Sequence, residues 1–279
     1  MSLTADGARL TEAHRLAQLA QARKVQAQLL AVWPMLSLDD IDGTREQWLT
    51  EAVAPVLAGA ATSAQIAARY YQAFRQVEIA EPVPPSVGEI RAAPNVARAT
   101  VTLDLAGPVA LKQAISRGSQ TPKRDALARM LGDSQRLVLD GGRSTLASQV
   151  HTDQRGRAYA RVTSGKACAF CLMLASRGAV YAKDTGDFNA HGTCACSVEP
   201  QFDAAGNYRL PDSVALAQSK WDAYRLDQEN NPDRYAGIFS GTKTHGPNKG
   251  EQRSISEADL LGFRRFVEDR GPAGWNPAT

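Results

Sequence analysis

All four cysteines of this 279-residue chain lie between residues 168 and 196, together with one histidine. They form a C-x2-C pair followed by an H-x2-C-x-C group, and the five residues are Cys168, Cys171, His191, Cys194 and Cys196. Thiolates and imidazoles are the usual ligands of structural zinc, which takes four of them in a tetrahedron. The spacing therefore predicts a Zn²⁺ site with more candidate ligands than places.

The C-x2-C pair and Cys194 are the strongest ligand candidates, and the fourth place stays open between His191 and Cys196. Side chains two apart on a strand share a face, so Cys194 and Cys196 can both reach one ion. Two other interpretations stay open, namely reduced cysteines without metal and a pair of disulfides. Residues 1–23 do not resemble a signal peptide, so we expect a reducing compartment, which disfavours disulfides.

A structural role is expected for this ion rather than a catalytic one. A catalytic zinc keeps one position open for water and needs a base close by. The candidate ligands fill all four places, and Glu199, the carboxylate that follows, does not stand in an H-E-x-x-H register. We therefore do not expect an enzyme, and a metal-dependent hydrolase or nuclease is the alternative.

Three arginines, Arg155, Arg157 and Arg161, stand just before the cysteines. A solvated strand that leads into the metal site explains them most simply. Contact with nucleic-acid phosphates is the competing interpretation, although three arginines are a weak signal. The formal net charge of +3 is too small to predict nucleic-acid binding from bulk charge. Because the three arginines could still contact phosphates, a nucleic-acid-binding module is a further alternative function.

The elements that must position these residues are mainly helices. Aromatic residues make up only 6% of the chain, a composition that favours helix over sheet. Apolar residues, Leu16 among them, recur at helical steps over residues 8–36. The capping-box pattern Thr44–Gln47 predicts a second helix that runs to about Ile79, with a break near Pro55. No apolar run is long enough to predict a membrane span.

Further helices are predicted on both sides of the cysteines. One begins at Pro122, because proline suits the first helical position, and is interrupted at Gly141 and Gly142. After the cysteines, apolar periodicity predicts helices over Asp212–Asn230 and Ile255–Asp269.

The predicted fold class is α+β and mostly α-helical, with long N-terminal helices, a small α+β knot pinned by zinc, and C-terminal helices. Four consecutive segments follow from this pattern. They are an N-terminal helical region 1–80, a proline-rich break and connecting segment 81–125, a core with the Cys/His knot 126–202, and C-terminal helices with a flexible tail 203–279.

Two short motifs carry a family resemblance. They are Cys168-Ala-Phe-Cys171-Leu-Met-Leu-Ala-Ser-Arg-Gly178 and His191-Gly-Thr-Cys194-Ala-Cys196. The stretch that contains them resembles the zinc-knot end of the MuF-like minor head proteins of tailed bacteriophages. The Met-Leu-Ala-Ser-Arg-Gly variant, with the lead-in Arg136–Thr145, is similar to the branch found in phages of actinobacteria.

This resemblance implies a minor capsid protein that acts in head morphogenesis. The implied partners are the phage portal protein and other head proteins, with packaged DNA as a further one. The implied location is the virion, in the head interior or portal region, and the host cytoplasm during assembly.

Overall fold

Helices make up most of the chain, and a small sheet accompanies the cysteines, which confirms the predicted, mostly α-helical α+β fold class. The structure is a computed structural model, and it describes residues 4–84, 87, 90, 94–163, 167–182, 190, 192–202, 211–244 and 248–270. The chain forms two compact units, which consist of residues 1–159 with 181–209 and of residues 160–180 with 210–279. Each unit thus combines parts that are separated in the sequence, whereas the predicted segments are consecutive.

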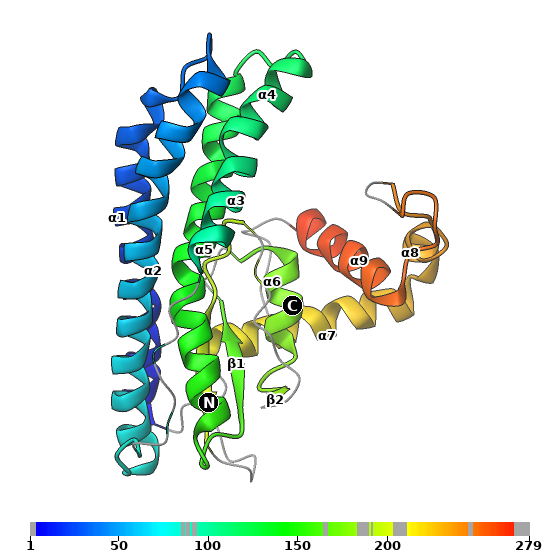
Figure 1. Cartoon of the computed structure of the whole chain (residues 1–279). Helices are drawn as coiled ribbons and strands as arrows, with labels where there is room; N and C mark the ends of the chain where they lie inside the picture. The colour runs from blue at the N-terminus through cyan, green and yellow to red at the C-terminus, as the bar shows by residue number, and fades with distance from the viewer. Residues whose placement is uncertain are drawn as a thin grey trace. The chain divides into compact units, whose positions relative to one another are not determined.

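Long helices build the first unit, and α1, α2 and α5 run side by side in it (Figure 1). Its helical elements are α1 (Ala5–Val32), the 3-10 turn η1 (Trp33–Met35), α2 (Ile41–Ile79), α3 (Val96–Ala106), α4 (Pro108–Ser116) and α5 (Pro122–Thr152). Their facing sides form the main core, in which Trp48, Leu103 and Val138 are fully buried.

Local capping sets the start of the second long helix. The Asp40 side chain accepts a hydrogen bond from the backbone N–H of Gly43 at 2.9 Å, so α2 begins at Ile41. The predicted capping box at Thr44 is therefore wrong about the start. Asp caps at least as well as Thr and comes first in the chain, which leaves Thr44 to bond the Asp40 carbonyl at 2.7 Å.

Neither predicted interruption occurs, since α2 continues through Pro55 and α5 continues through Gly141 and Gly142. Interior glycine and proline disfavour helix by about 1 and 3 kcal/mol, which tertiary packing can override. A Cβ at Gly141 would lie 2.1 Å from the Ala60 carbonyl oxygen, so this glycine permits close approach of α5 to α2. The Gly142 N–H also donates to the Ser63 hydroxyl at 3.0 Å.

The predicted apolar stripe is buried at Ala22, Val25 and Leu29 in the C-terminal half of α1, but the N-terminal half buries polar side chains instead. Leu16 is 53% exposed, whereas Thr11, His14 and Gln18 are buried. The Thr11 and Tyr70 hydroxyls share a hydrogen bond of 2.7 Å, and the His14 ring stacks on the Tyr70 ring with centroids 4.3 Å apart. Side chains of α2 therefore select which face of α1 turns inward.

A three-stranded sheet in the order β2-β1-β3 follows α5, and its strands are β1 (Ala158–Val162), β2 (Tyr181–Ala182) and β3 (Ser197–Gln201). Strand β1 pairs antiparallel with β2, with Ala158 opposite Ala182. All residues of β1 and β3 are buried. Strand β3 begins directly after Cys196, so the sheet helps to fix the end of the cysteine motif.

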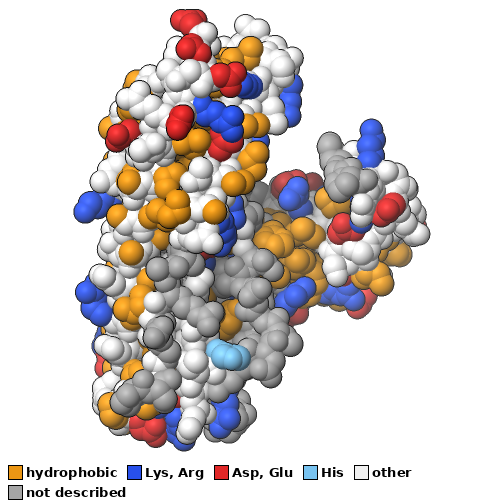
Figure 2. Space-filling model, in the orientation of Figure 1, with side chains coloured by type: hydrophobic (Ala, Val, Ile, Leu, Met, Phe, Trp, Pro, Cys, Tyr) orange, Lys and Arg blue, Asp and Glu red, His pale blue; other side chains and the backbone are white. Residues whose placement is uncertain are grey.

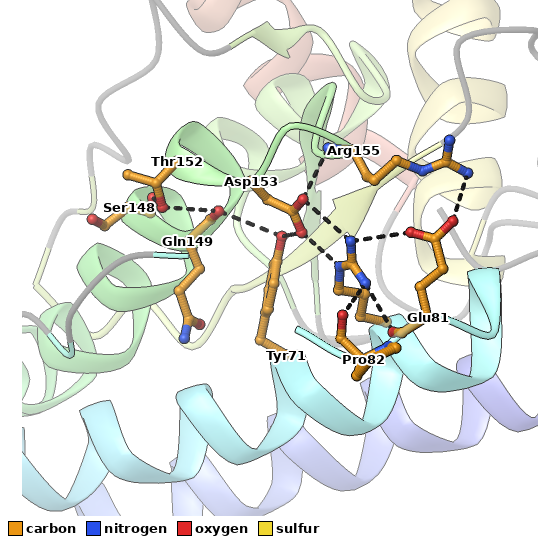
Figure 3. A network of polar contacts seen from close by, with 9 residues as sticks. Tyr71, Glu81, Pro82, Ser148, Gln149, Thr152, Asp153 and Arg155 are labelled. Atoms are coloured by element: carbon orange, nitrogen blue, oxygen red, sulfur yellow. Dashed lines mark hydrogen bonds and ion pairs between the residues drawn. The ribbon is translucent and has the colours of Figure 1, made fainter. Parts of the chain in front are cut away.

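A buried polar network fixes the chain between α5 and β1 (Figure 3). The Asp153 carboxylate accepts hydrogen bonds from the Tyr71 hydroxyl at 2.8 Å, from Arg75 Nε at 2.7 Å and from the Arg155 N–H at 2.8 Å. Arg75 also donates to the Glu81 carbonyl at 2.8 Å. Burial by itself would raise the pKa of Asp153, but these hydrogen bonds outweigh it and hold that pKa below its ordinary value.

The second unit has an aromatic core of its own. Its helices are α6 (Ala169–Ser176), α7 (Asp212–Asn230), α8 (Pro232–Phe239) and α9 (Ile255–Arg270). The Trp221 ring lies 5.2 Å from the Tyr224 ring and 5.0 Å from the Phe263 ring, measured between centroids. Within the described part of the chain, no helix is long and apolar enough to cross a membrane.

Candidate metal centre

Three of the five predicted ligands come together in the structure. Cys171, Cys194 and Cys196 are buried, and their sulfur atoms lie within 4.8 Å of one another. Sulfur atoms on one tetrahedral zinc stand about 3.8 Å apart, since each Zn–S bond is about 2.3 Å long. All four cysteines are free thiols, so the disulfide interpretation finds no support here. Three close, buried thiols can bind a metal ion.

Cys168, the first predicted ligand, is not part of this group. Cys168 precedes α6 as its N-cap residue and is exposed, whereas Cys171 lies in the first turn of that helix. His191 lies outside the described residues. The two alternatives for the fourth ligand were His191 and Cys196, and of these Cys196 lies beside Cys194.

Helix α5 anchors the turn that carries Cys194. Thr193 has a left-handed backbone with φ of 64°, a conformation that is uncommon for a residue other than glycine. Its N–H donates to the Gly132 carbonyl at 3.0 Å, and its carbonyl accepts from Gln135 Nε2 at 2.9 Å. A Cβ at Gly132 would lie 2.7 Å from the Thr193 methyl carbon, so glycine allows this close approach. Helix α5 thus holds both the N–H and the carbonyl of Thr193 in the strained turn.

Arg143 of α5 contacts the cysteine motif directly. Its Nη2 donates to the Cys194 carbonyl at 2.9 Å and to the Cys196 carbonyl at 2.9 Å, and its Nε donates to the Cys196 carbonyl at 3.1 Å. The same Nη2 lies 3.4 Å from the Cys194 sulfur. The Asp140 carboxylate accepts from Arg143 Nη1 at 3.2 Å. Sequence reasoning missed Arg143, although its stretch belongs to the lead-in quoted for the family resemblance.

The donor set determines which ions fit. Thiolates are soft ligands that favour ions such as Zn²⁺ over Mg²⁺ or Ca²⁺, which prefer oxygen. With Cys171, Cys194 and Cys196 all buried, little of the sulfur surface faces solvent. This arrangement suits an ion that holds chain segments together.

Comparison with known proteins identifies the family. The model of the family described as VG15 protein matches residues 5–221 of the chain. The chain belongs to the VG15 family. This membership indicates a phage protein of a virion-related kind. No curated protein and no solved structure gives a significant match.

The VG15 match covers the whole candidate metal centre. It begins at the first residue of α1 and ends within α7, so it includes Arg143 and all four cysteines. Residues 222–279, which contain α8 and α9, lie beyond it.

The three arginines that precede the cysteines in this VG15 protein have different surroundings. Arg155 and Arg157 are exposed, and Arg155 lies 3.5 Å from the Glu81 carboxylate. Arg161 is only 1% exposed on β1, so the prediction that it offers its charge to phosphates is wrong in this structure. Neighbouring side chains of a strand point to opposite faces, and every residue of β1 is buried, so both faces of the strand are covered. Phosphate contact stays a prediction for Arg155 and Arg157.

Proposed function

We propose that this VG15-family protein is a MuF-like minor capsid protein of a tailed phage. In this proposal it takes part in head morphogenesis and is associated with the portal protein. Family membership over residues 5–221 supports a virion-related role, and the cysteine motifs support the finer assignment. Its place is then the virion, near the portal or inside the head.

We further propose that Cys171, Cys194 and Cys196 together bind Zn²⁺ in a structural role and that the protein is not an enzyme. The observation that carries this is the cluster of three buried sulfur atoms within 4.8 Å of one another. A structural site adds its binding free energy to folding, whereas a catalytic one must admit water. Cys168 or His191 supplies the fourth ligand.

Metal analysis of the purified full chain tests the zinc site. We expect one zinc per chain in the wild type, and loss of that zinc together with a lower melting temperature in Cys194→Ser. Cys168→Ser then decides the fourth ligand, because zinc is retained only if Cys168 does not bind it. A zinc-free wild-type protein, purified without chelator, would contradict the proposal.

The first unit offers a surface on which the portal contact can be tested. A groove of about 700 Å³ runs along α2 beside α3, and its apolar lining includes Leu49, Val53, Leu57 and Val96. Val96 is 62% exposed, and hydrophobic side chains gather over this part of the molecule (Figure 2). Grooves of this kind accept an amphipathic helix of a partner, so we propose a portal helix as the occupant.

Co-purification with the portal protein of the same phage tests this association. We expect the wild type and Leu16→Glu, a matched change at an exposed leucine of α1, to bind the portal equally. Val96→Glu should weaken binding by at least tenfold, because a carboxylate would be buried against apolar side chains. Equal binding of both variants excludes the groove, and absence of the protein from purified particles contradicts the capsid role.

A further inference from the structure

We infer that Arg143 is a positioning residue for the cluster of cysteine thiols at the candidate metal centre, and that Asp140 and Arg98 hold Arg143 in place. This inference rests on the proposed metal site. It adds a function for α5, namely to fix the backbone of the segment Cys194–Cys196. It concerns contacts inside the first unit only.

The Arg143 guanidinium holds the backbone on both sides of Ala195. It donates to the carbonyls of Cys194 and Cys196, which are two residues apart, through bonds of 2.9 to 3.1 Å. Both carbonyls therefore point at one planar group. This fixes the backbone of the segment Cys194–Cys196, and with it the directions from which the two sulfur atoms approach an ion.

The charge of Arg143 also suits a thiolate site. Its side chain is 4% exposed, and its Nη2 lies 3.4 Å from the Cys194 sulfur. A divalent ion bound by three thiolates carries a net negative charge, which a buried cation close by offsets. A hydrogen bond to a ligating atom from outside the coordination sphere tunes and orients that ligand.

Asp140 and Arg98 complete the arrangement. One Asp140 oxygen accepts from Arg143 Nη1 at 3.2 Å, and the other accepts from Arg98 Nη2 at 2.6 Å. Arg143 and Asp140 lie one helical turn apart on α5, whereas Arg98 comes from α3. The carboxylate thus uses both oxygens to fix the guanidinium that contacts the cysteines.

The same helix contains a matched control. Asp133 and Arg136 stand seven residues earlier with the same spacing, and Arg136 Nη2 lies 3.2 Å from the Asp133 carboxylate. The Arg136 side chain is 22% exposed. Substitution of Arg136 therefore removes a similar ion pair from α5 without touching the carbonyls of the cysteine segment.

The test is a Co²⁺ titration of the metal-free full chain, followed by Zn²⁺ competition. We expect the wild type to show a thiolate-to-cobalt charge-transfer band. Arg143→Met should weaken Zn²⁺ binding by about 10- to 100-fold, the usual effect of losing an outer-shell partner, and alter the band. Arg136→Met should change neither. Arg143→Lys keeps the charge but not the forked geometry, so it should not restore the wild-type spectrum.

Each outcome decides the inference. A folded Arg143→Met with wild-type affinity and spectrum overturns it while leaving the metal site standing, as does full rescue by lysine. A wild type that binds neither ion overturns the proposed metal site and this inference together. If Arg143→Met does not fold, Arg98→Met decides, since it removes only the outer partner of Asp140 at a half-exposed position. It should lower the affinity by a smaller factor in the same direction, and an unchanged affinity overturns the inference.

Discussion

At the scale of single residues, the first unit buries the polar side chain of His14. His14 is 5% exposed, and its Nδ1 has no hydrogen-bond partner among the described residues. Burial without such a partner disfavours the protonated imidazole, and it lowers the pKa of His14 from 6.5 to about 3. The folded chain therefore keeps this histidine neutral, which makes its stability sensitive to acid.

The acid sensitivity from His14 can be measured directly. Between pH 6.5 and pH 3 the unfolded chain binds a proton at this histidine and the folded chain does not, so stability falls as the pH falls. The cost between pH 7 and pH 5 is about 2 kcal/mol. Denaturant titrations at both pH values should show this loss in the wild type and in His151→Gln, where an exposed histidine of α5 is replaced. His14→Phe keeps a ring beside Tyr70 and should lose about 2 kcal/mol less, and an unchanged loss would contradict the assignment.

Among the elements, apolar periodicity predicted the bounds of a helix well where the local sequence marks its ends. The predicted range Asp212–Asn230 is that of α7, and α9 begins at the predicted Ile255. The predicted breaks at Pro55 and Gly141 failed because propensity is local, whereas the packing of α2 against α5 joins residues far apart in sequence.

The candidate site shows the same division between local and distant information. Residue type and spacing identified the cysteines as candidate ligands, because the ability to bind a metal depends on the type of side chain. Arg143 could not be found in this way, because it bonds carbonyls 51 and 53 residues further along the chain. Only the path of α5 past the cysteine segment shows which of the many arginines is the relevant one.

Replacement of one glycine tests how closely the helices approach. Gly141→Ala should raise the intrinsic helix propensity of α5, yet its Cβ would collide with the Ala60 carbonyl at 2.1 Å. We expect a net loss of about 3 kcal/mol in the free energy of unfolding. The control is Gly237→Ala on α8, where an added Cβ meets nothing within 4 Å, and it should gain about 0.5 to 1 kcal/mol. A gain in both variants would show that the helices can move apart at little cost.

The whole molecule has hydrophobic cores in both units. The core around Trp48 and Leu103 belongs to the first unit, and the aromatic core around Tyr224 and Phe263 belongs to the second. A unit with its own core can in principle fold by itself. The VG15 match ends inside α7, so the second core is only partly within the family model.

Calorimetry of the metal-free full chain tests whether the two cores unfold separately. Leu103 and Phe263 are both fully buried, and their replacement by alanine costs about 2–5 and 3–5 kcal/mol respectively. We expect two heat-absorption peaks, with Leu103→Ala lowering the temperature of one and Phe263→Ala that of the other. If a single peak moves in both variants, the units unfold together, because a change confined to one core can shift the whole transition only when the two are energetically coupled.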